Sequence, residues 1–124
     1  MRRKNKMYLF VYGTLKQGFH NHHLLADAEF ICNAASKQNY PMVNTEEYFP
    51  YLIDNEGHGY NVKGEVYRID EAILEMLDIL EGYPQHYTRR EIEVVSLGID
   101  LLAITYFLNE KIEYKDLELL ESFE

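Results

Sequence analysis

Short apolar runs that end at turn residues mark most of the chain. The first run, Tyr8–Tyr12, is uncharged and rich in β-prone residues, and it stops at Gly13. Such a run predicts a buried strand that ends at a turn. Gly64, inside another such run, indicates a bulge or a close approach of neighbouring backbone, and Gly98 predicts an antiparallel hairpin between the last two runs. The other predicted strands are residues 30–37, 62–69, 88–97 and 100–108. Positions in 62–69 and 88–97 alternate between two sides and include charged residues, whereas 101–108 are nearly all apolar.

Helical spacing is clearest over residues 71–81. The sequence predicts one apolar face made of Ile73, Met76, Leu77 and Leu80. Asp70 stands where an N-cap residue belongs, and Gly82 and Pro84 follow the predicted end of the helix. Acids on the other side of this helix, Glu75 and Asp78, are interpreted as a solvated face.

Three segments have weaker patterns. Residues 20–28 predict a short helix, and residues 110–120 predict a second helix near the end of the chain. Residues 40–59 have no clean period and contain two prolines, Pro41 and Pro50, and several aromatic residues. Because a long segment without regular structure often belongs to a binding site, we interpret 40–59 as an ordered wall of such a site.

Together these elements predict an α+β fold, a small and mainly antiparallel β-barrel with flanking helices. Most of the strands are joined too closely for parallel crossovers. With 124 residues and no repeat or linker, the chain is expected to form a single domain, 1–124, in which residues 1–6 are disordered.

Charge and cysteine content narrow the function. The net charge of −9 argues against a nucleic-acid or anionic-membrane surface as the main function. No apolar run is long enough for a membrane span. One cysteine, Cys32, excludes an internal disulfide and fits the cytoplasm. All the charged residues among the first sixteen are basic, whereas most of those in 109–124 are acidic. These opposite charges either bring the two ends together or only aid solubility.

Two places could carry chemistry. The loop from Gly13 to Gly18 can turn steeply, and consecutive N–H groups in such a turn can bind an anion, although for this loop taken alone a purely structural role is favoured. Glu81 lies in the last turn of the predicted helix, where the helix dipole disfavours a carboxylate. A residue that breaks a local rule in this way is a weak sign of a functional site.

Other reactive side chains fit structural roles better. The cluster His20, His22 and His23 lacks the spacing of a zinc motif, so exposed polar residues are favoured and no metal is expected. Cys32 has no activating neighbour, and we interpret it as a small buried hydrophobe. None of the few serines lies in a nucleophile-elbow context. The sequence therefore indicates no covalent nucleophile and no cofactor.

A series of short motifs follows in a fixed order over residues 7–108. These motifs are VYGTLKQG (11–18), HNH (20–22), YPMV (40–43), FPYL (49–52), GEVY (64–67), LDILEG (77–82) and YTR (87–89). Together they resemble those of the γ-glutamylcyclotransferase-like family, and within it the γ-glutamylamine cyclotransferase and AIG2-like branch. Residues 82–86 and the end of the chain depart from the family pattern.

The resemblance implies an enzyme that releases 5-oxoproline from a small γ-glutamyl amide, with Glu81 as the catalytic acid and base. It also implies that the substrate is bound by Tyr12, Gly13, Thr14 and Leu15. Tyr87 is either a hydrogen-bonding partner in the site or a packing residue. The alternative is a non-catalytic binding or interaction module on the same fold. Neither the released amine nor the oligomeric state can be inferred from the sequence.

Overall fold

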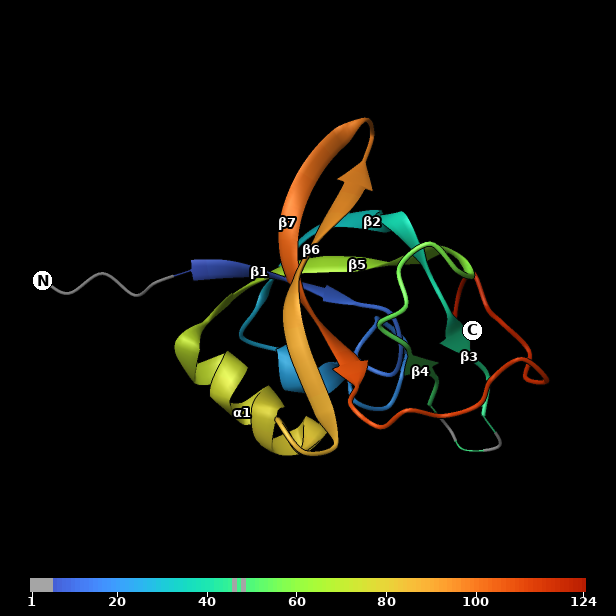
Figure 1. The fold of residues 1–124 in the computed structure, drawn as a ribbon. Helices are drawn as coiled ribbons and strands as arrows, with labels where there is room; N and C mark the ends of the chain where they lie inside the picture. The colour runs from blue at the N-terminus through green and yellow to red at the C-terminus, as the bar shows by residue number, and fades with distance from the viewer. Residues whose placement is uncertain (1–5, 46, 48) are drawn as a thin grey trace, which may run out of the picture.

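The computed structural model describes residues 6–45, 47 and 49–124. In this part of the chain five strands close a barrel in the order β1–β5–β2–β6–β7 (Figure 1). The neighbouring strands are antiparallel, except that β1 meets β7 in parallel at Leu9 and Ile104. The predicted α+β barrel is therefore confirmed. Its strands are β1 (Lys6–Val11), β2 (Glu29–Tyr40), β5 (Tyr60–Asp70), β6 (Tyr87–Ser96) and β7 (Ile99–Leu108).

Strand β1 supplies both sides of the core because its side chains alternate. Leu9 and Val11 join a cluster that includes residues of the helix, whereas Phe10 joins a cluster formed by the other strands. Gly64 of β5 is the predicted close approach, since a Cβ there would lie 2.8 Å from the Phe10 ring. Residues 1–5 of the expected disordered segment lie outside the described residues, and Lys6 already pairs with Asp70.

Helix α1 (Glu71–Glu81) covers one side of the barrel, at the lower left of Figure 1. The side chain of Asp70 accepts a hydrogen bond from the Ile73 N–H at 3.0 Å, which confirms the N-cap. At the other end Gly82 adopts a φ of 65°, and its N–H reaches the carbonyls of the last turn.

The buried face of α1 is narrower than predicted. Ile73 and Leu77 are buried, but Met76 and Leu80 are 37% and 44% exposed. The apolar face predicted from the sequence has four residues, but the barrel contacts only part of the helix circumference. None of the helices in the described residues has the length and apolar character needed to cross a membrane.

A short 3₁₀ helix and a small two-stranded sheet flank the barrel. The 3₁₀ helix η1 (His22–Leu25) replaces the longer helix expected over 20–28. Residues 40–59 contain β3 (Met42–Val43) and β4 (Tyr51–Leu52), which pair with each other in a small antiparallel sheet.

The helix expected over residues 110–120 is wrong. This segment is irregular, turns at residues 115–116 and runs beside β3 and β4, at the right of Figure 1. Leu119 forms a β-bridge with Val43, and the Leu120 N–H donates to the carbonyl of Met42 at 2.8 Å. The open edge of β3 offers backbone groups that need partners, and this demand outweighs the weak helical pattern of the segment.

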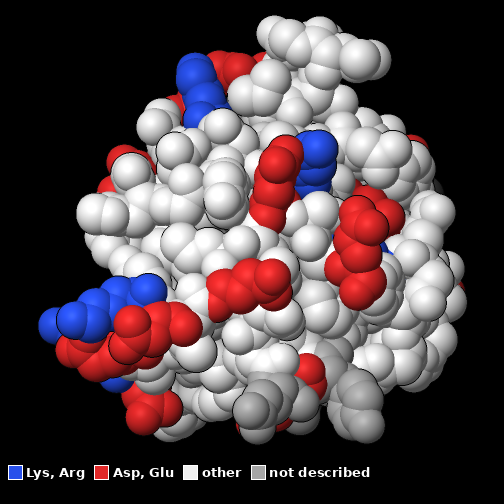
Figure 2. Space-filling model, turned by 90° about the vertical axis from the view of Figure 1, so that its right-hand side faces the viewer, with Lys and Arg blue, Asp and Glu red and all other residues white. Residues whose placement is uncertain are grey.

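The acidic end of the chain contacts the loop after β1 and strand β5. The Lys16 ammonium donates to the Phe123 carbonyl at 2.6 Å, and Lys63 of β5 forms a 3.0 Å ion pair with Glu121. Acidic side chains predominate on the face that carries β3, β4 and the C-terminal segment (Figure 2).

Candidate active site

A pocket of about 190 Å³ opens where β1 ends and the last turn of α1 approaches it. The six residues singled out from the sequence, Tyr12, Gly13, Thr14, Leu15, Glu81 and Tyr87, all line this pocket. They come from three elements that are distant in sequence. The rest of the lining is Phe10, Val11, Asn21, Phe49, Pro50, Leu80, His86 and Tyr106.

The loop after β1 is held by its own hydrogen bonds. The Lys16 N–H donates to the Gly13 carbonyl at 3.0 Å, which closes a tight turn. Asn21 braces the loop from outside, because its backbone N–H and its side-chain amide donate to the carbonyl and the hydroxyl of Thr14 at 3.1 and 2.9 Å. Glycine at position 13 lets the backbone lie close to Pro50, because a Cβ there would be 3.2 Å from the proline ring.

This arrangement leaves donors available at the pocket. The backbone N–H groups of Gly13, Thr14 and Leu15 have no acceptor among the described residues. Three consecutive N–H groups that line a pocket can bind a carboxylate or a developing oxyanion.

Glu81, the last residue of α1, is half-buried in this pocket. Burial raises the pKa of Glu81 from its ordinary value near 4.5 to about 7. No described residue donates a hydrogen bond to its carboxylate. A carboxyl group that is removed from water and receives no hydrogen bond titrates close to neutral pH, which suits an acid or base catalyst.

Three tyrosines surround Glu81. The Tyr12 hydroxyl donates to the Tyr106 carbonyl at 2.8 Å. Burial raises the pKa of Tyr12 and of Tyr87, and the nearby negative charge of Glu81 raises both further. Tyr87 is buried and packs edge-on against His86, with ring centroids 4.8 Å apart. These hydroxyls therefore stay protonated, and Glu81 is the group of this set that titrates near neutrality.

Asp78, one turn before Glu81, does not belong to a solvated face as expected from the sequence. Its side chain is 23% exposed and accepts hydrogen bonds from Arg89 at 2.8 and 3.1 Å and from the Tyr106 hydroxyl at 2.7 Å. Burial would raise the pKa of Asp78, but these hydrogen bonds outweigh burial and hold it below its ordinary value. The correction arises because Arg89 and Tyr106 come from β6 and β7, which the helix pattern does not reveal.

Residues 40–59, interpreted from the sequence as the wall of a binding site, do contribute to the pocket. Phe49 and Pro50 line the pocket, and Tyr51 packs against Phe49 with centroids 5.7 Å apart. The proline and aromatic content was the signal for this wall. Tyr106 and His86 carried no such signal, because each lies at an ordinary strand or turn position and reaches the pocket only through the barrel closure.

The remaining candidates make local contacts. His22 and His23 each direct Nδ1 at a backbone carbonyl, of Leu15 and of His20 respectively, at 3.0 Å. Among the described residues no group of three or more His, Cys, Asp or Glu side chains gathers as a metal site would require. Cys32 is half-buried in β2 and packs against the barrel cluster.

Comparison with known sequences gives one family. The family described as "Gamma-glutamyl cyclotransferase, AIG2-like" matches residues 9–124. A Danio rerio protein named γ-glutamylaminecyclotransferase A is 44% identical over 92 residues, which are 69% of this chain and 57% of that protein. A Methanocaldococcus jannaschii protein described as a candidate γ-glutamylcyclotransferase is 39% identical over 119 residues, which are 88% of this chain and 96% of that protein. The chain thus spans nearly all of the archaeal relative but less than two thirds of the fish one.

Comparison with solved structures agrees. The crystal structure of an AIG2-like protein from Mus musculus superimposes with a TM-score of 0.90 at 31% identity, and the match covers 97% of this chain and 89% of that chain. Fold, pocket and sequence therefore point the same way: the chain belongs to the AIG2-like γ-glutamyl cyclotransferase family, a family of cyclotransferase-type enzymes.

Proposed function

We propose that this protein is a γ-glutamyl-amide cyclotransferase that releases 5-oxoproline and a free amine, with Glu81 as general acid and base. The observation that carries the proposal is the position of Glu81, half-buried in a pocket that the Gly13–Leu15 N–H groups also line. The names of the relatives support the same class of substrate, a γ-glutamyl amide.

The reaction needs no nucleophile from the protein. The α-amine of the substrate attacks its own γ-carbonyl carbon, a new C–N bond closes the five-membered ring, and the original amide C–N bond breaks. Two protons leave the attacking nitrogen. Glu81 accepts the one that the α-ammonium loses before the attack and gives it to the departing nitrogen, and the second, which the ring nitrogen loses as it becomes an amide, ends on the released amine as its ammonium. Holding the amine and carbonyl in a near-attack pose supplies much of the catalysis, since well-oriented intramolecular reactions gain roughly 7–11 kcal/mol.

The pKa of Glu81 suits this proton transfer. An α-ammonium has a pKa near 8, so transfer to an ordinary glutamate of pKa about 4.3 is uphill by about 5 kcal/mol. With the pKa of Glu81 raised to about 7, the gap falls to about one unit, or about 1.4 kcal/mol. Burial of Glu81 therefore removes most of the cost of the first step.

The backbone N–H groups of the loop take the negative charge of the substrate. In the proposed pose they bind the α-carboxylate or the oxyanion that develops on the γ-carbonyl. The wall formed by Phe49 and Pro50 is where the released amine would be selected. We also propose that the enzyme acts in the cytoplasm on a small molecule and not on nucleic acid, based on the single cysteine and the net charge of −9.

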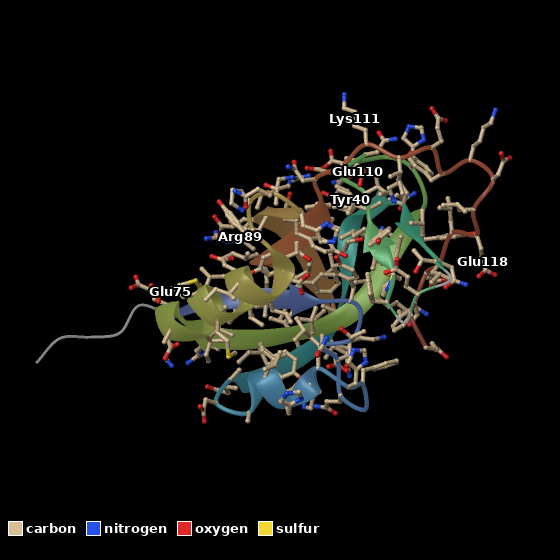
Figure 3. All side chains as sticks on the ribbon, turned by 90° about the horizontal axis from the view of Figure 1, so that it is seen from below. Tyr40, Glu75, Arg89, Glu110, Lys111 and Glu118 are labelled. Atoms are coloured by element: carbon tan, nitrogen blue, oxygen red, sulfur yellow. The ribbon has the colours of Figure 1, made fainter. Side chains whose placement is uncertain are left out.

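The test is release of 5-oxoproline from a panel of γ-glutamyl amides, including ε-(γ-glutamyl)lysine and γ-glutamyl dipeptides. Wild type is expected to turn over at least one member, and Glu81→Gln is expected to lose about 10²–10⁴ in kcat, the usual contribution of a general acid–base group. Glu75→Gln is the matched control, because Glu75 is an exposed acid on the same helix that does not line the pocket (Figure 3).

The outcomes separate the candidate functions. Full activity in Glu81→Gln, with the fold intact by circular dichroism, would contradict the role of Glu81. No release from any panel member would contradict cyclotransferase activity on these amides and favour the alternative, a non-catalytic binding module on the same fold.

A further inference from the structure

The last turn of α1 lacks the apolar anchors of the earlier turns. Ile73 and Leu77 are buried against the barrel, but beyond them Ile79 is 83% exposed and Leu80 is 44% exposed. Glu81 follows directly. Hydrophobic packing therefore fixes the first two turns of the helix, and another interaction has to hold the turn that carries Glu81.

An ion pair takes that place. Asp78 lies three residues before Glu81, on the same turn, and accepts two hydrogen bonds from Arg89, at 2.8 Å from Nε and 3.1 Å from Nη2. The Arg89 guanidinium also lies 4.3 Å from the centroid of the Tyr83 ring, just after Glu81 in the chain. Arg89 thus holds the chain on both sides of Glu81, and its planar fork fixes direction as well as distance.

Tyr106 joins this pair to the other half of the pocket. Its hydroxyl donates to Asp78 at 2.7 Å, and its backbone carbonyl accepts the Tyr12 hydroxyl at 2.8 Å. One residue of β7 therefore contacts both the turn that carries Glu81 and the residue that begins the loop at 12–15. The distance between the carboxylate and the loop donors depends on this connection.

We propose that the Asp78–Arg89 pair, joined to Tyr106, is a positioning unit that holds Glu81 toward the loop donors. The kinetic part of this inference rests on the proposed cyclotransferase function. Asp78 and Arg89 do not line the pocket, so they act through Glu81 and are not catalytic residues.

The pair also controls the charge that Glu81 experiences. The groups affected by the charge of Glu81 are Tyr12 after β1, Tyr87 from β6 and Tyr106 from β7. Asp78 lies three residues before Glu81 on the same helix, and His86 lines the same pocket. Asp78 is ionised, and Arg89 compensates its charge. Without Arg89, an uncompensated carboxylate one turn away would disfavour ionisation of Glu81 and raise its pKa.

The next residue provides a matched control. Arg90 forms a similar two-point ion pair with Asp54, at 3.0 and 2.8 Å. Alternation along β6 sends Arg90 to the other face of the strand, where it lies over the Phe107 ring. Neither Arg90 nor Asp54 lines the pocket. The side chains of Arg90 and Asp54 are 42% and 38% exposed, against 26% and 23% for Arg89 and Asp78. Only loss of the Arg89 pair should affect Glu81.

The experiment compares wild type, Arg89→Gln, Arg90→Gln and the double variant Asp78→Asn/Arg89→Gln. The pKa of Glu81 is measured by NMR titration of the side-chain carboxyl carbons, and kcat and KM by 5-oxoproline release. We expect Arg89→Gln to lower kcat by about 10- to 100-fold with KM little changed, because misplacement of a catalytic group affects the transition state. We expect the pKa of Glu81 to rise by about half to one unit.

The double variant removes the uncompensated charge as well, so the pKa of Glu81 should return to the wild-type value. Arg90→Gln should change neither the pKa nor kcat. An unchanged Glu81 pKa and kcat in Arg89→Gln would overturn the inference, and so would equal effects of Arg90→Gln. If Arg89→Gln does not fold, Arg89→Lys replaces it: because Lys keeps the charge but lacks the planar fork, the pKa of Glu81 should stay at the wild-type value while kcat falls, and an unchanged kcat would overturn the inference. The NMR titration needs no turnover, so its result stands even if wild type releases no 5-oxoproline.

Discussion

The two ends of helix α1 each carry an acid, and the two acids have opposite environments. Asp70 lies at the N-terminal end, where it accepts a hydrogen bond from the Ile73 N–H at 3.0 Å and the helix dipole favours negative charge. Glu81 lies at the C-terminal end, where the dipole disfavours a carboxylate. No described residue donates to Glu81, and burial raises its pKa to about 7.

The difference separates an acid that stabilises the fold from one suited to chemistry. Hydrogen bonds to a carboxylate and a favourable helix dipole both stabilise its ionised form. Such a carboxylate is therefore a poor proton acceptor at neutral pH. Glu81 lacks this stabilisation, and its proton affinity is correspondingly high. A helix of eleven residues thus has a structural acid at its start and, in the proposed function, a catalytic acid at its end.

The largest effect on stability should come from Glu81→Gln. The folded-state pKa of Glu81 is raised above the value near 4.5, so ionisation of Glu81 opposes folding increasingly from about pH 4.5 to about pH 7 and by a constant amount above that. Glutamine does not ionise. At pH 8 the variant should therefore be more stable than wild type by about 1–3 kcal/mol, with the gain vanishing below pH 4.5.

Urea unfolding at several pH values measures this gain. Glu75→Gln serves as the control, because Glu75 is exposed and should give a pH-independent change below about 0.5 kcal/mol. A Glu81→Gln variant that is less stable than wild type at pH 8 would contradict the claim that burial raises the pKa of Glu81.

A smaller effect of opposite sign is expected at the other end of the helix. Asp70→Ala removes the cap of α1 and should lower stability by about 1 kcal/mol. Its kcat should stay at the wild-type value, because Asp70 does not line the pocket. Thermal unfolding together with 5-oxoproline release tests both parts. A loss of kcat in Asp70→Ala without a loss of stability would contradict a purely structural role for Asp70.

The sequence was most informative where structure is local. The cap at Asp70, the helix end at Gly82 and the strands on either side follow from short-range rules, and the structure confirms them. The six predicted site residues meet in one pocket, and their roles stay predictions. Motif order, rather than any single motif, made this part predictable.

Long-range contacts account for the rest. Asp78 looked solvated because its partners, Arg89 and Tyr106, lie on strands that only the barrel closure brings to the helix. The segment 110–120 has apolar residues at spacings that fit a weak helix, but Leu119 forms a β-bridge with Val43 at the edge of β3 instead. In both cases a partner distant in sequence decides the outcome, and local patterns contain no information about it.

The pH dependence of kcat/KM tests the central claim most directly, since it reports on the ionisation of Glu81 in the free enzyme. The account predicts an ascending limb with a midpoint near pH 7 in wild type. In Glu81→Gln this limb should be absent, so that the residual activity follows only the substrate amine, near pH 8. A limb near pH 7 that persists in Glu81→Gln, or a wild-type midpoint near pH 4.5, would contradict the assignment of Glu81 as the base.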